Sequence, residues 1–571
     1  MNLISTNNAN YILRLLEAEG INYFFMVPGK LINPIMSCYN KQISSSYVIR
    51  PIVAAHEAGA TAMADGYARA TGHFGVCIVI DGPGTTNAVP MLTAAQADRS
   101  SVLLIAGQIP RDFRGMGAIQ DTTASGISTV DMLKTVCNKS IEISHTTVLP
   151  RFFKSAIRNI IGINKGTGYI SISKDILLEE QKEIPTCTTK PCDKPSIIDI
   201  NATDEFVDKI LSKNQKVIIL TGSHCNKEKL YYSLKEFSEK YSIPVATTIS
   251  SKGLFDEEHP NFIGLYGYSG HERAFKTISS READVILLLG FDATQWTTLA
   301  WHPALLSHKN LFHIDQRPSL IGEYVESEGI IAEPETFLKY LDKKAEPYLT
   351  KGNNSRKIWL KKIRKQPLYT QDLTDIYSAQ PIHPALIVQE ARSIFPIDTI
   401  AVADAGVHRS YAAHYWKTYG PYQFFAATKY APMGWAVPAS IGIKLACPEQ
   451  RVVTFTGDGC MLMSGLEIQT AAKLNLDITF IVFNNGFYGA SYFNNIDNEE
   501  CLTKIPLHNW ALIAEGLGVK GFRVTEPSKL RNTYKEALAN SGTKLIDIVC
   551  NHTARAPFKL YAETLKTQPF M

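Results

Sequence analysis

Two short polar turns in the last third of the chain carry oxygen atoms that could hold a metal ion. Gly457-Asp458-Gly459 follows the apolar run RVVTFT, and Asn484-Asn485 follows the apolar run ITFIVF, with the helix-like stretch GLEIQTAAKLNL between them. Both turns are therefore expected at the ends of neighbouring strands. A carboxylate and an amide oxygen suit Mg²⁺ bound through a diphosphate, and glycines let backbone approach phosphate oxygens closely. Two ordinary polar connections would show the same residues, so that alternative stays open at this point.

Three blocks of alternating strand-like and helix-like segments must position these turns. Short Val/Ile/Leu runs bounded by Gly and Pro, with helices between them, are typical of a parallel sheet covered on both faces. We expect an α/β fold of three consecutive doubly wound parallel sheets, in residues 1–180, 198–340 and 375–571. In such sheets ligands bind beyond the carboxyl ends of the strands, which is where both turns are expected.

Composition and the stretches between the blocks limit the class of protein. Residues 179–196 indicate a linker, and the basic residues 343–367 indicate a solvated connecting helix rather than a nucleic-acid patch. The net charge of +4 favours neither a nucleic acid nor a membrane as partner. No apolar run reaches the roughly 18 residues of a membrane span. The chain begins without an export signal, so we expect a cytoplasmic protein with reduced cysteines.

The second Asn of the pair lies 27 residues after the Asp, and this GDG…NN spacing resembles the diphosphate motif of thiamine diphosphate (ThDP) enzymes. The resemblance implies Mg²⁺ ligation by Asp458, Asn485 and the backbone carbonyl of Phe487. Such enzymes also need a glutamate in the first block, and AAHEAGATAMADGYARATG (54–72) resembles the segment that carries it. Glu57 is thereby implied as the catalytic residue that hydrogen-bonds N1′ of the aminopyrimidine ring. Taken alone, Glu57 would equally fit a surface carboxylate at a helix end.

Further segments of the first block resemble cofactor-binding parts of the same family. DGPGTTN (81–87) implies that Pro83 and Asn87 contact the pyrimidine side, and MVPG (26–29) implies a closing turn with Val27 and Pro28. GAIQD (117–121) resembles the Phe-Gln-Glu segment of acetolactate-synthase relatives, which implies Gln120 as a second catalytic residue near the reacting end of the cofactor. The residues on either side of Gln120 depart from that pattern.

The third block extends the implied cofactor site. DAGVHRSYAA (404–413) resembles a turn that contacts the diphosphate, and APMGWAVPASIG (431–442) resembles the segment whose bulky residue wedges the cofactor into its bent shape. His408 is the implied diphosphate contact, Met433 the implied wedge, and the Ala431 carbonyl the implied partner of the 4′-amino group. The resemblance completes the cofactor-binding set with Val407, Gly457, Gly459, Cys460, Tyr488 and Gly489.

The order of the three blocks is similar to that of the acetolactate synthase, pyruvate oxidase and 2-oxo acid decarboxylase group. It implies a pyrimidine-binding and a diphosphate-binding ThDP domain around a Rossmann-like central domain, in a homodimer or homotetramer with active sites between subunits. We expect an enzyme that decarboxylates a small 2-oxo acid and ligates the resulting enamine to an aldehyde or oxo-acid acceptor. The main alternative is a decarboxylase that releases an aldehyde; others are an FAD-dependent oxidase and a non-catalytic ThDP-binding regulatory or scaffold protein.

FAD stays open as a cofactor but is disfavoured by the second block. LLLGFDATQWTT (287–298) lacks the Arg of the flavin-contacting Gly-x-Arg-Phe-Asp turn, and LTGSHCN (220–226) stands where a Gly-rich nucleotide turn is expected. His313-Ile314-Asp315 does resemble the acid-bearing strand end that meets a nucleotide ribose. An empty nucleotide site in the central domain is therefore the preferred interpretation, and the oxidase is disfavoured with the flavin.

Overall fold

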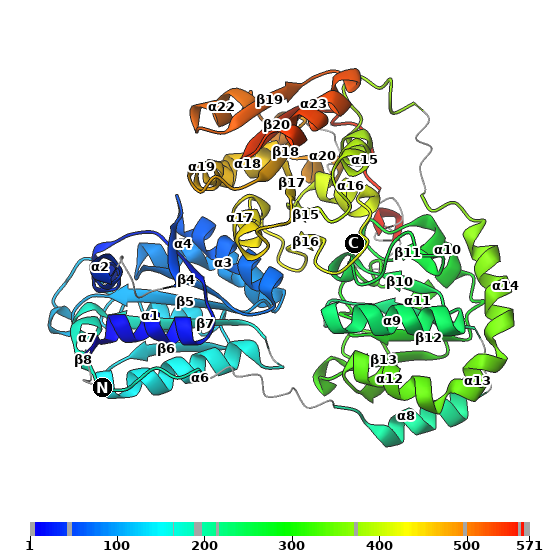
Figure 1. Cartoon of the computed structure of the whole chain (residues 1–571), viewed down its shortest axis with the longest axis horizontal. Helices are drawn as coiled ribbons and strands as arrows, with labels where there is room; N and C mark the ends of the chain where they lie inside the picture. Colours follow the sequence, from blue (N-terminus) through cyan, green and yellow to red (C-terminus); the bar gives the residue numbers. More distant parts are fainter. Residues whose placement is uncertain are drawn as a thin grey trace.

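Three six-stranded sheets form the framework of the molecule, and every strand pair within them is parallel (Figure 1). Helices cover the faces of the sheets, so the expected α/β architecture is confirmed. The computed structural model describes residues 6–42, 48–163, 165–187, 197–212, 216–225, 227–369, 375–494, 500–557 and 561–564.

The N-terminal sheet, blue to cyan in Figure 1, has the strand order β3-β2-β4-β5-β7-β6. Its central strands are continuous buried runs because helices cover both faces. The strand order reverses between β2 and β4, which makes the carboxyl ends of these two strands the place where a ligand would bind. The strands are β2 (Tyr23–Met26), β3 (Arg50–Val53), β4 (Gly75–Ile80), β5 (Val102–Gln108), β6 (Lys139–Ile143) and β7 (Thr167–Ser173). The main helices are α1 (Asn8–Ala18), α3 (Glu57–Thr71), α4 (Pro83–Ala97) and α6 (Leu149–Ile161).

The C-terminal sheet follows the same path, with the order β16-β15-β17-β18-β20-β19. Its strand order reverses between β15 and β17. The strands are β15 (Ile400–Ala403), β16 (Phe424–Ala426), β17 (Val452–Gly457), β18 (Ile478–Asn484), β19 (Lys520–Val524) and β20 (Lys544–Val549). The helices near its carboxyl edge are α16 (Val407–Tyr415), α17 (Ala436–Ala446), α18 (Asp458–Ser464), α19 (Ile468–Lys473) and α20 (Gly489–Asn494).

The central sheet, green in Figure 1, has a different order, β11-β10-β9-β12-β13-β14. Its first strand lies in the middle, as in Rossmann folds, and the order reverses between β9 and β12. The strands are β9 (Val217–Thr221), β10 (Val245–Thr247), β11 (Phe262–Leu265), β12 (Val285–Leu289), β13 (Leu311–Asp315) and β14 (Glu328–Ile331).

The basic stretch 343–367 is helical with exposed lysines, as the sequence predicted, but it also has a buried apolar face. It forms α13 (Glu346–Lys351) and α14 (Asn353–Arg364), and α14 packs along the central domain through Trp359, Leu360 and Ile363. The prediction did not include this buried face because it weighed the charged residues and not the apolar residues at helical spacing between them. Much of the predicted linker, 188–196, lies outside the described residues. Within the described part of the chain, no helix has both the length and the apolar character needed to cross a bilayer.

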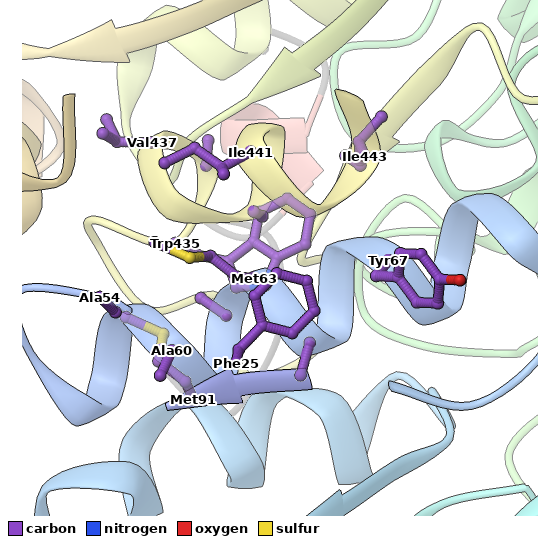
Figure 2. Packing of buried hydrophobic residues seen from close by; sticks show 14 of the residues in the cluster. Phe25, Ala54, Ala60, Met63, Tyr67, Met91, Trp435, Val437, Ile441 and Ile443 are labelled. Carbon is purple, nitrogen blue, oxygen red and sulfur yellow. The ribbon is translucent and has the colours of Figure 1, made fainter. Parts of the chain in front are cut away.

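Helices α3 and α17 join the N-terminal and C-terminal domains. A Cβ added to Gly66 on α3 would lie 2.2 Å from the Ala439 carbonyl oxygen, and one added to Gly442 on α17 would lie 1.9 Å from the Met63 carbonyl oxygen. Glycine at both positions therefore lets the two backbones approach each other. Figure 2 shows the core that the domains share, with side chains from both, among them Phe25, Met63, Met91, Trp435 and Ile441. This shared core fixes α3, whose first residue is Glu57.

Candidate cofactor site

Asp458 begins α18 directly after β17, so no loop separates the strand from the helix. The sequence predicted a turn here and one helix from Gly465 onward. Instead α18 starts at Asp458, and a 3₁₀ turn (Gly465–Glu467) separates it from α19. Burial raises the pKa of Asp458 to about 6, although three backbone N–H groups donate hydrogen bonds to it.

The turn after β18 folds back onto Asp458. Oδ2 of Asp458 accepts hydrogen bonds from the backbone N–H groups of Asn485 (3.0 Å) and Gly486 (2.6 Å). Oδ1 of Asn485 accepts one from the N–H of Phe487 at 3.0 Å. Gly486 has a φ of +72°, which glycine adopts without strain. The three residues predicted as metal ligands therefore lie in one compact arrangement.

This donor set fits a metal ion that is shared with a diphosphate. Within the described part of the chain, Oδ1 of Asp458 accepts one hydrogen bond, from the N–H of Gly459 at 2.9 Å, which leaves a lone pair for another partner. Among the described residues, no group of three or more His, Cys, Asp or Glu side chains could hold a metal by itself. One carboxylate, one amide oxygen and one backbone carbonyl suit Mg²⁺, which takes its remaining ligands from phosphate and water.

A cavity opens beside this turn, and its empty space together with the solvent at its mouth amounts to about 680 Å³. Its wall is formed by segments that follow the carboxyl ends of β15, β17, β18 and β20. Most of the predicted cofactor-binding residues of the third block line it: Val407, His408, Met433, Gly457, Asp458, Gly459, Cys460, Asn485, Phe487, Tyr488 and Gly489. Ala431 is not on the wall; it lies two residues before Met433 with a φ of +52°.

His408 packs against two glycines of the cavity. A Cβ on Gly406 would lie 2.6 Å from Cε1 of His408, and one on Gly457 would lie 2.8 Å from its Nδ1. Burial lowers the pKa of His408 to about 3, so the imidazole is neutral. Its Nε2 is buried and has no hydrogen-bond partner in the described part of the chain. A buried polar atom of this kind is costly unless a ligand atom satisfies it, which fits the predicted phosphate contact.

Met433 and Tyr488 meet over α18. A Cβ on Gly459 would lie 3.0 Å from Cε of Met433 and 2.7 Å from Cε1 of Tyr488. Glycine at position 459 therefore leaves room for the side chains of Met433 and Tyr488. It also allows a ligand to approach the backbone closely.

Asp404 is a site residue that the sequence analysis did not single out. It is buried at the end of β15, and its Oδ1 accepts hydrogen bonds from the N–H groups of Ala405, Gly434 and Trp435 at 2.9, 3.0 and 3.2 Å. Asp404 thereby anchors the segment that carries Met433 to the sheet. The sequence did contain a sign of its role. Asp404 directly follows the apolar run TIAVA, just as Asp458 directly follows RVVTFTG.

Glu57 and Asn87 contact each other in the N-terminal domain. Nδ2 of Asn87 donates a hydrogen bond to Oε2 of Glu57 at 3.0 Å. A Cβ added to Gly84 would lie 3.4 Å from Oε1 of Glu57. Gln120, with a φ of +64°, lies over the neighbouring turn, because a Cβ on Gly82 would be 3.5 Å from Cβ of Gln120.

The remaining predicted residues of the N-terminal domain flank the point where its strand order reverses. Val27 and Pro28 follow β2, and Pro83 follows β4. A Cβ on Gly29 would lie 2.2 Å from Cγ2 of Ile80, so the two strand ends are in contact. The structure therefore gathers the residues predicted for the pyrimidine side at the carboxyl edge of one sheet.

The two candidate half-sites, the Glu57–Asn87 pair of the N-terminal domain and the cavity of the C-terminal domain, are separate within one chain. Among the described residues, none that lines the cavity comes from the N-terminal domain. The half-sites are linked by Glu467, a buried residue whose Oε1 accepts hydrogen bonds from the N–H groups of Ala55 and His56, both at 3.1 Å. These bonds hold the chain just before Glu57. Sequence reasoning missed Glu467 because its partners lie 412 and 411 residues away.

Three family models match the chain in the order of its three sheets. Residues 6–128 match the N-terminal TPP binding domain of thiamine pyrophosphate enzymes, residues 205–341 their central domain, and residues 404–548 their C-terminal TPP binding domain. The chain belongs to the thiamine pyrophosphate enzyme family. The family predicted from the GDG…NN spacing is thereby confirmed, and thiamine pyrophosphate, that is ThDP, is the cofactor that the two outer domains of this family bind.

Proteins similar to this thiamine pyrophosphate enzyme match nearly its full length. A probable acetolactate synthase large subunit of Methanocaldococcus jannaschii is 28% identical, covering 96% of this chain and 93% of its own length. A putative thiamine pyrophosphate-containing protein of Bacillus subtilis is 26% identical, covering 96% and 92%. Acetolactate synthase isozyme 2 large subunit of Escherichia coli is 24% identical, covering 95% of each chain.

Proposed function

We propose that this thiamine pyrophosphate enzyme is a Mg²⁺-dependent carboligase that decarboxylates a small 2-oxo acid and joins the remaining fragment to a carbonyl acceptor. The observation that carries the proposal is the presence of both half-sites, the Glu57–Asn87 contact and the turn that folds Asn485 onto Asp458. A protein that only bound the cofactor would need the second half-site but not the glutamate. Relatives named acetolactate synthase favour ligation over simple release of an aldehyde.

Glu57 is the proposed proton carrier. Bound ThDP would supply the carbon nucleophile and the electron sink for loss of CO₂. The Glu57 carboxyl would hold a proton at Oε1 for the aminopyrimidine ring, while Asn87 fixes its orientation through Oε2. The hydrogen bond from Asn87 would keep the Glu57 carboxyl in one orientation while the proton on Oε1 is transferred.

The C-terminal cavity is the proposed place of the diphosphate. Asp458, Asn485 and the Phe487 carbonyl would hold Mg²⁺, and the buried imidazole of His408 would lie against the diphosphate. Met433, on the wall of the same cavity, would support the bent cofactor.

A homodimer is part of the proposal, because the half-sites of one chain do not share a cavity. Large apolar side chains are exposed beside each half-site, a pattern that marks protein interfaces. Near Gln120 these are Met116, Ile119 and Ile127, and after Asp458 they are Leu462, Met463 and Leu466.

Analysis of the products tests the proposal. The protein loaded with ThDP and Mg²⁺ is incubated with ¹³C-labelled small 2-oxo acids such as pyruvate, each with and without aldehyde or oxo-acid acceptors, and the products are identified by mass spectrometry. We expect labelled CO₂ and a ligated hydroxyketone product. An aldehyde as sole product, with every acceptor, would replace the carboligase with a decarboxylase. Absence of CO₂ from every acid would contradict both.

A further inference from the structure

The carboxyl edge of the central sheet is the part of the molecule that the proposed chemistry does not use. In an open parallel sheet the crevice where the strand order reverses, here between β9 and β12, is the general ligand-binding place. In dinucleotide-binding domains the turn after the first strand offers free backbone N–H groups to the pyrophosphate, and an acidic residue accepts a hydrogen bond from the ribose. In this chain the corresponding groups are the backbone N–H groups of the turn after β9 and the carboxylate of Asp315 at the end of β13.

Three consecutive N–H groups of the turn after β9 donate hydrogen bonds inside the protein. The N–H of Gly222 donates to the Leu289 carbonyl at 3.0 Å, and the N–H of His224 donates to the Gly290 carbonyl at 2.9 Å. The N–H of Ser223 donates to Oδ1 of Asp292 at 3.1 Å. These three N–H groups are not free to bind a phosphate oxygen.

Gly222 follows β9 and Gly290 follows β12, and both glycines allow the turns after these two strands to pack against each other. A Cβ on Gly222 would lie 2.4 Å from Cα of Phe291, and one on Gly290 would lie 2.8 Å from Sγ and 2.9 Å from N of Cys225. In a nucleotide-binding turn, glycine makes room for the ligand; here it makes room for the opposite turn. The crevice between β9 and β12 is therefore closed by the chain itself.

Asp315, the acidic residue at the end of β13, is also occupied. Its Oδ2 accepts a hydrogen bond from Nδ1 of His224 at 2.9 Å, and its Oδ1 accepts from N and Nε of Arg317 at 2.9 and 3.1 Å. The Asp315 side chain is 1% exposed. Nε2 of His224, Nε2 of His313 and Oδ2 of Asp292 are buried and have no hydrogen-bond partner among the described residues.

We propose that this closed arrangement, formed by Gly222–Cys225, Gly290–Asp292, Asp315 and Arg317, replaces a nucleotide in the central domain, so that the protein binds no FAD. The sequence left FAD open; the hydrogen bonds of the turns decide against it. The proposal goes beyond the reaction proposed above and stands without it, because flavin content is measured on the purified protein without any turnover.

Flavin content and thermal stability of the full-length protein test the proposal. The protein is purified from cells supplied with riboflavin, denatured, and its supernatant assayed for FAD by chromatography. We expect far less than one FAD per ten chains and no rise in Tm when FAD is added in large excess, because a ligand that binds the folded state would raise Tm. FAD close to one per chain, or a Tm that rises with FAD concentration, would overturn the proposal.

Two variants test whether the closed turns are part of the fold. Asp315→Asn removes the charge shared by His224 and Arg317 and should lower Tm by several degrees without any nucleotide. Asp208→Asn, at an exposed position of the same domain, should leave Tm unchanged. An Asp315→Asn variant with the wild-type Tm would show that Asp315 is not a structural anchor and would also overturn the proposal.

Discussion

Glu57 and Asp458 are both carboxylates on the first residue of a helix, yet their surroundings fit them for different tasks. Asp458 is buried and accepts hydrogen bonds from three backbone N–H groups, which hold it as a fixed acceptor at the cavity. Glu57 is half-buried in the single chain, and its carboxyl accepts a side-chain hydrogen bond from Asn87. The first arrangement suits metal binding and the second suits proton transfer.

Replacing Glu57 with Gln should lower kcat by about 10²- to 10⁴-fold, the usual size of a lost proton-transfer group. Affinity for ThDP and Mg²⁺ should change little, because glutamine keeps the shape and a polar partner for Asn87. Steady-state kinetics and calorimetric titration of the cofactor measure the two quantities separately. Glu180→Gln, at an exposed position of β8 (Glu180–Gln181), is the matched control and should keep the wild-type kcat. A Glu57→Gln variant with wild-type kcat would contradict the proposed role.

At the scale of elements, the contact between α3 and α17 connects the two ThDP half-sites of one chain. Backbone meets backbone there, so the contact depends on two glycines rather than on side-chain shape. A displacement of α3 would move Glu57, and a displacement of α17 would move the segment of Met433. A change that loosens the packing of α3 against α17 would therefore lower the stability of the protein and also shift Glu57 and the segment of Met433.

Gly442→Ala should destabilise the protein by about 1–3 kcal/mol or more, the range for overpacking a tight core. The added Cβ would meet the Met63 carbonyl oxygen at 1.9 Å, and a backbone atom cannot turn aside as a side chain can. The midpoint of urea unfolding measures the effect. Gly516→Ala, in α22 (Trp510–Gly516), has nothing within 4 Å and is the control, with a change below about 1 kcal/mol. Equal midpoints for both variants would refute the close contact.

The C-terminal end of α16 holds the central domain through two buried histidines. Nδ1 of His414 donates a hydrogen bond to the Ser269 carbonyl at 2.9 Å, and Nε2 of His271 donates to the His414 carbonyl at 2.9 Å. Burial lowers the pKa of His414 to about 4, with Lys252 contributing, and lowers the pKa of His271 well below its ordinary value. Both rings are neutral in the folded protein at neutral pH.

The contribution of neutral His414 to stability should therefore fall as the pH decreases from about 6.5 to about 4. In this window the unfolded state binds a proton that folded His414 does not, so the contribution is complete above the unfolded pKa and decreases as pH falls toward the folded one, by about 3 kcal/mol for this group. Melting curves across this pH range measure it. His414→Asn keeps a donor for Ser269 and should show a shallower decline, whereas His145→Asn, at an exposed position, should behave as wild type. An unchanged slope in His414→Asn would assign the acid sensitivity to other groups.

At the scale of the whole molecule, one chain carries both halves of the proposed active site but does not bring them into one cavity. Exposed apolar side chains flank each half, and a symmetric pair of chains would bury both sets and complete two sites at once. The dimer would then be a condition of activity as well as of solubility.

Mixing two inactive variants tests this arrangement. Glu57→Gln and Asp458→Ala should each be inactive, but a heterodimer of the two contains one site with both residues intact. After dissociation and reassociation of an equal mixture, up to about a quarter of wild-type activity should return, because half of the dimers are mixed and each has one good site of two. Each variant carried alone through the same treatment is the control. No recovery in a mixture shown by native mass spectrometry to contain heterodimers would place each site within one chain.

Local sequence patterns were sufficient for the parts of the site that one strand–helix–strand unit contains. Asp458 and Asn485 follow neighbouring parallel strands, so their proximity follows from the fold class alone. The start of α18 at Asp458 was missed because GDG signals a turn by composition, whereas in the structure Asp458 is the first helical residue and its side chain accepts hydrogen bonds from the Asn485 turn. The burial of α14 was missed because its charges outnumber its apolar residues.

By itself, the sequence determined three parallel sheets, the family, and the places where strand ends carry polar residues, because alternating apolar runs and Gly-rich turns are local properties of the chain. The tertiary structure decided which distant groups satisfy one another. It showed that Glu467 holds the backbone before Glu57 and that Asp404 holds the segment of Met433. It also showed that the N–H groups of Gly222, Ser223 and His224 are already bonded. Whether a buried polar group is free or satisfied depends on partners far away in the chain, and only the folded arrangement supplies them.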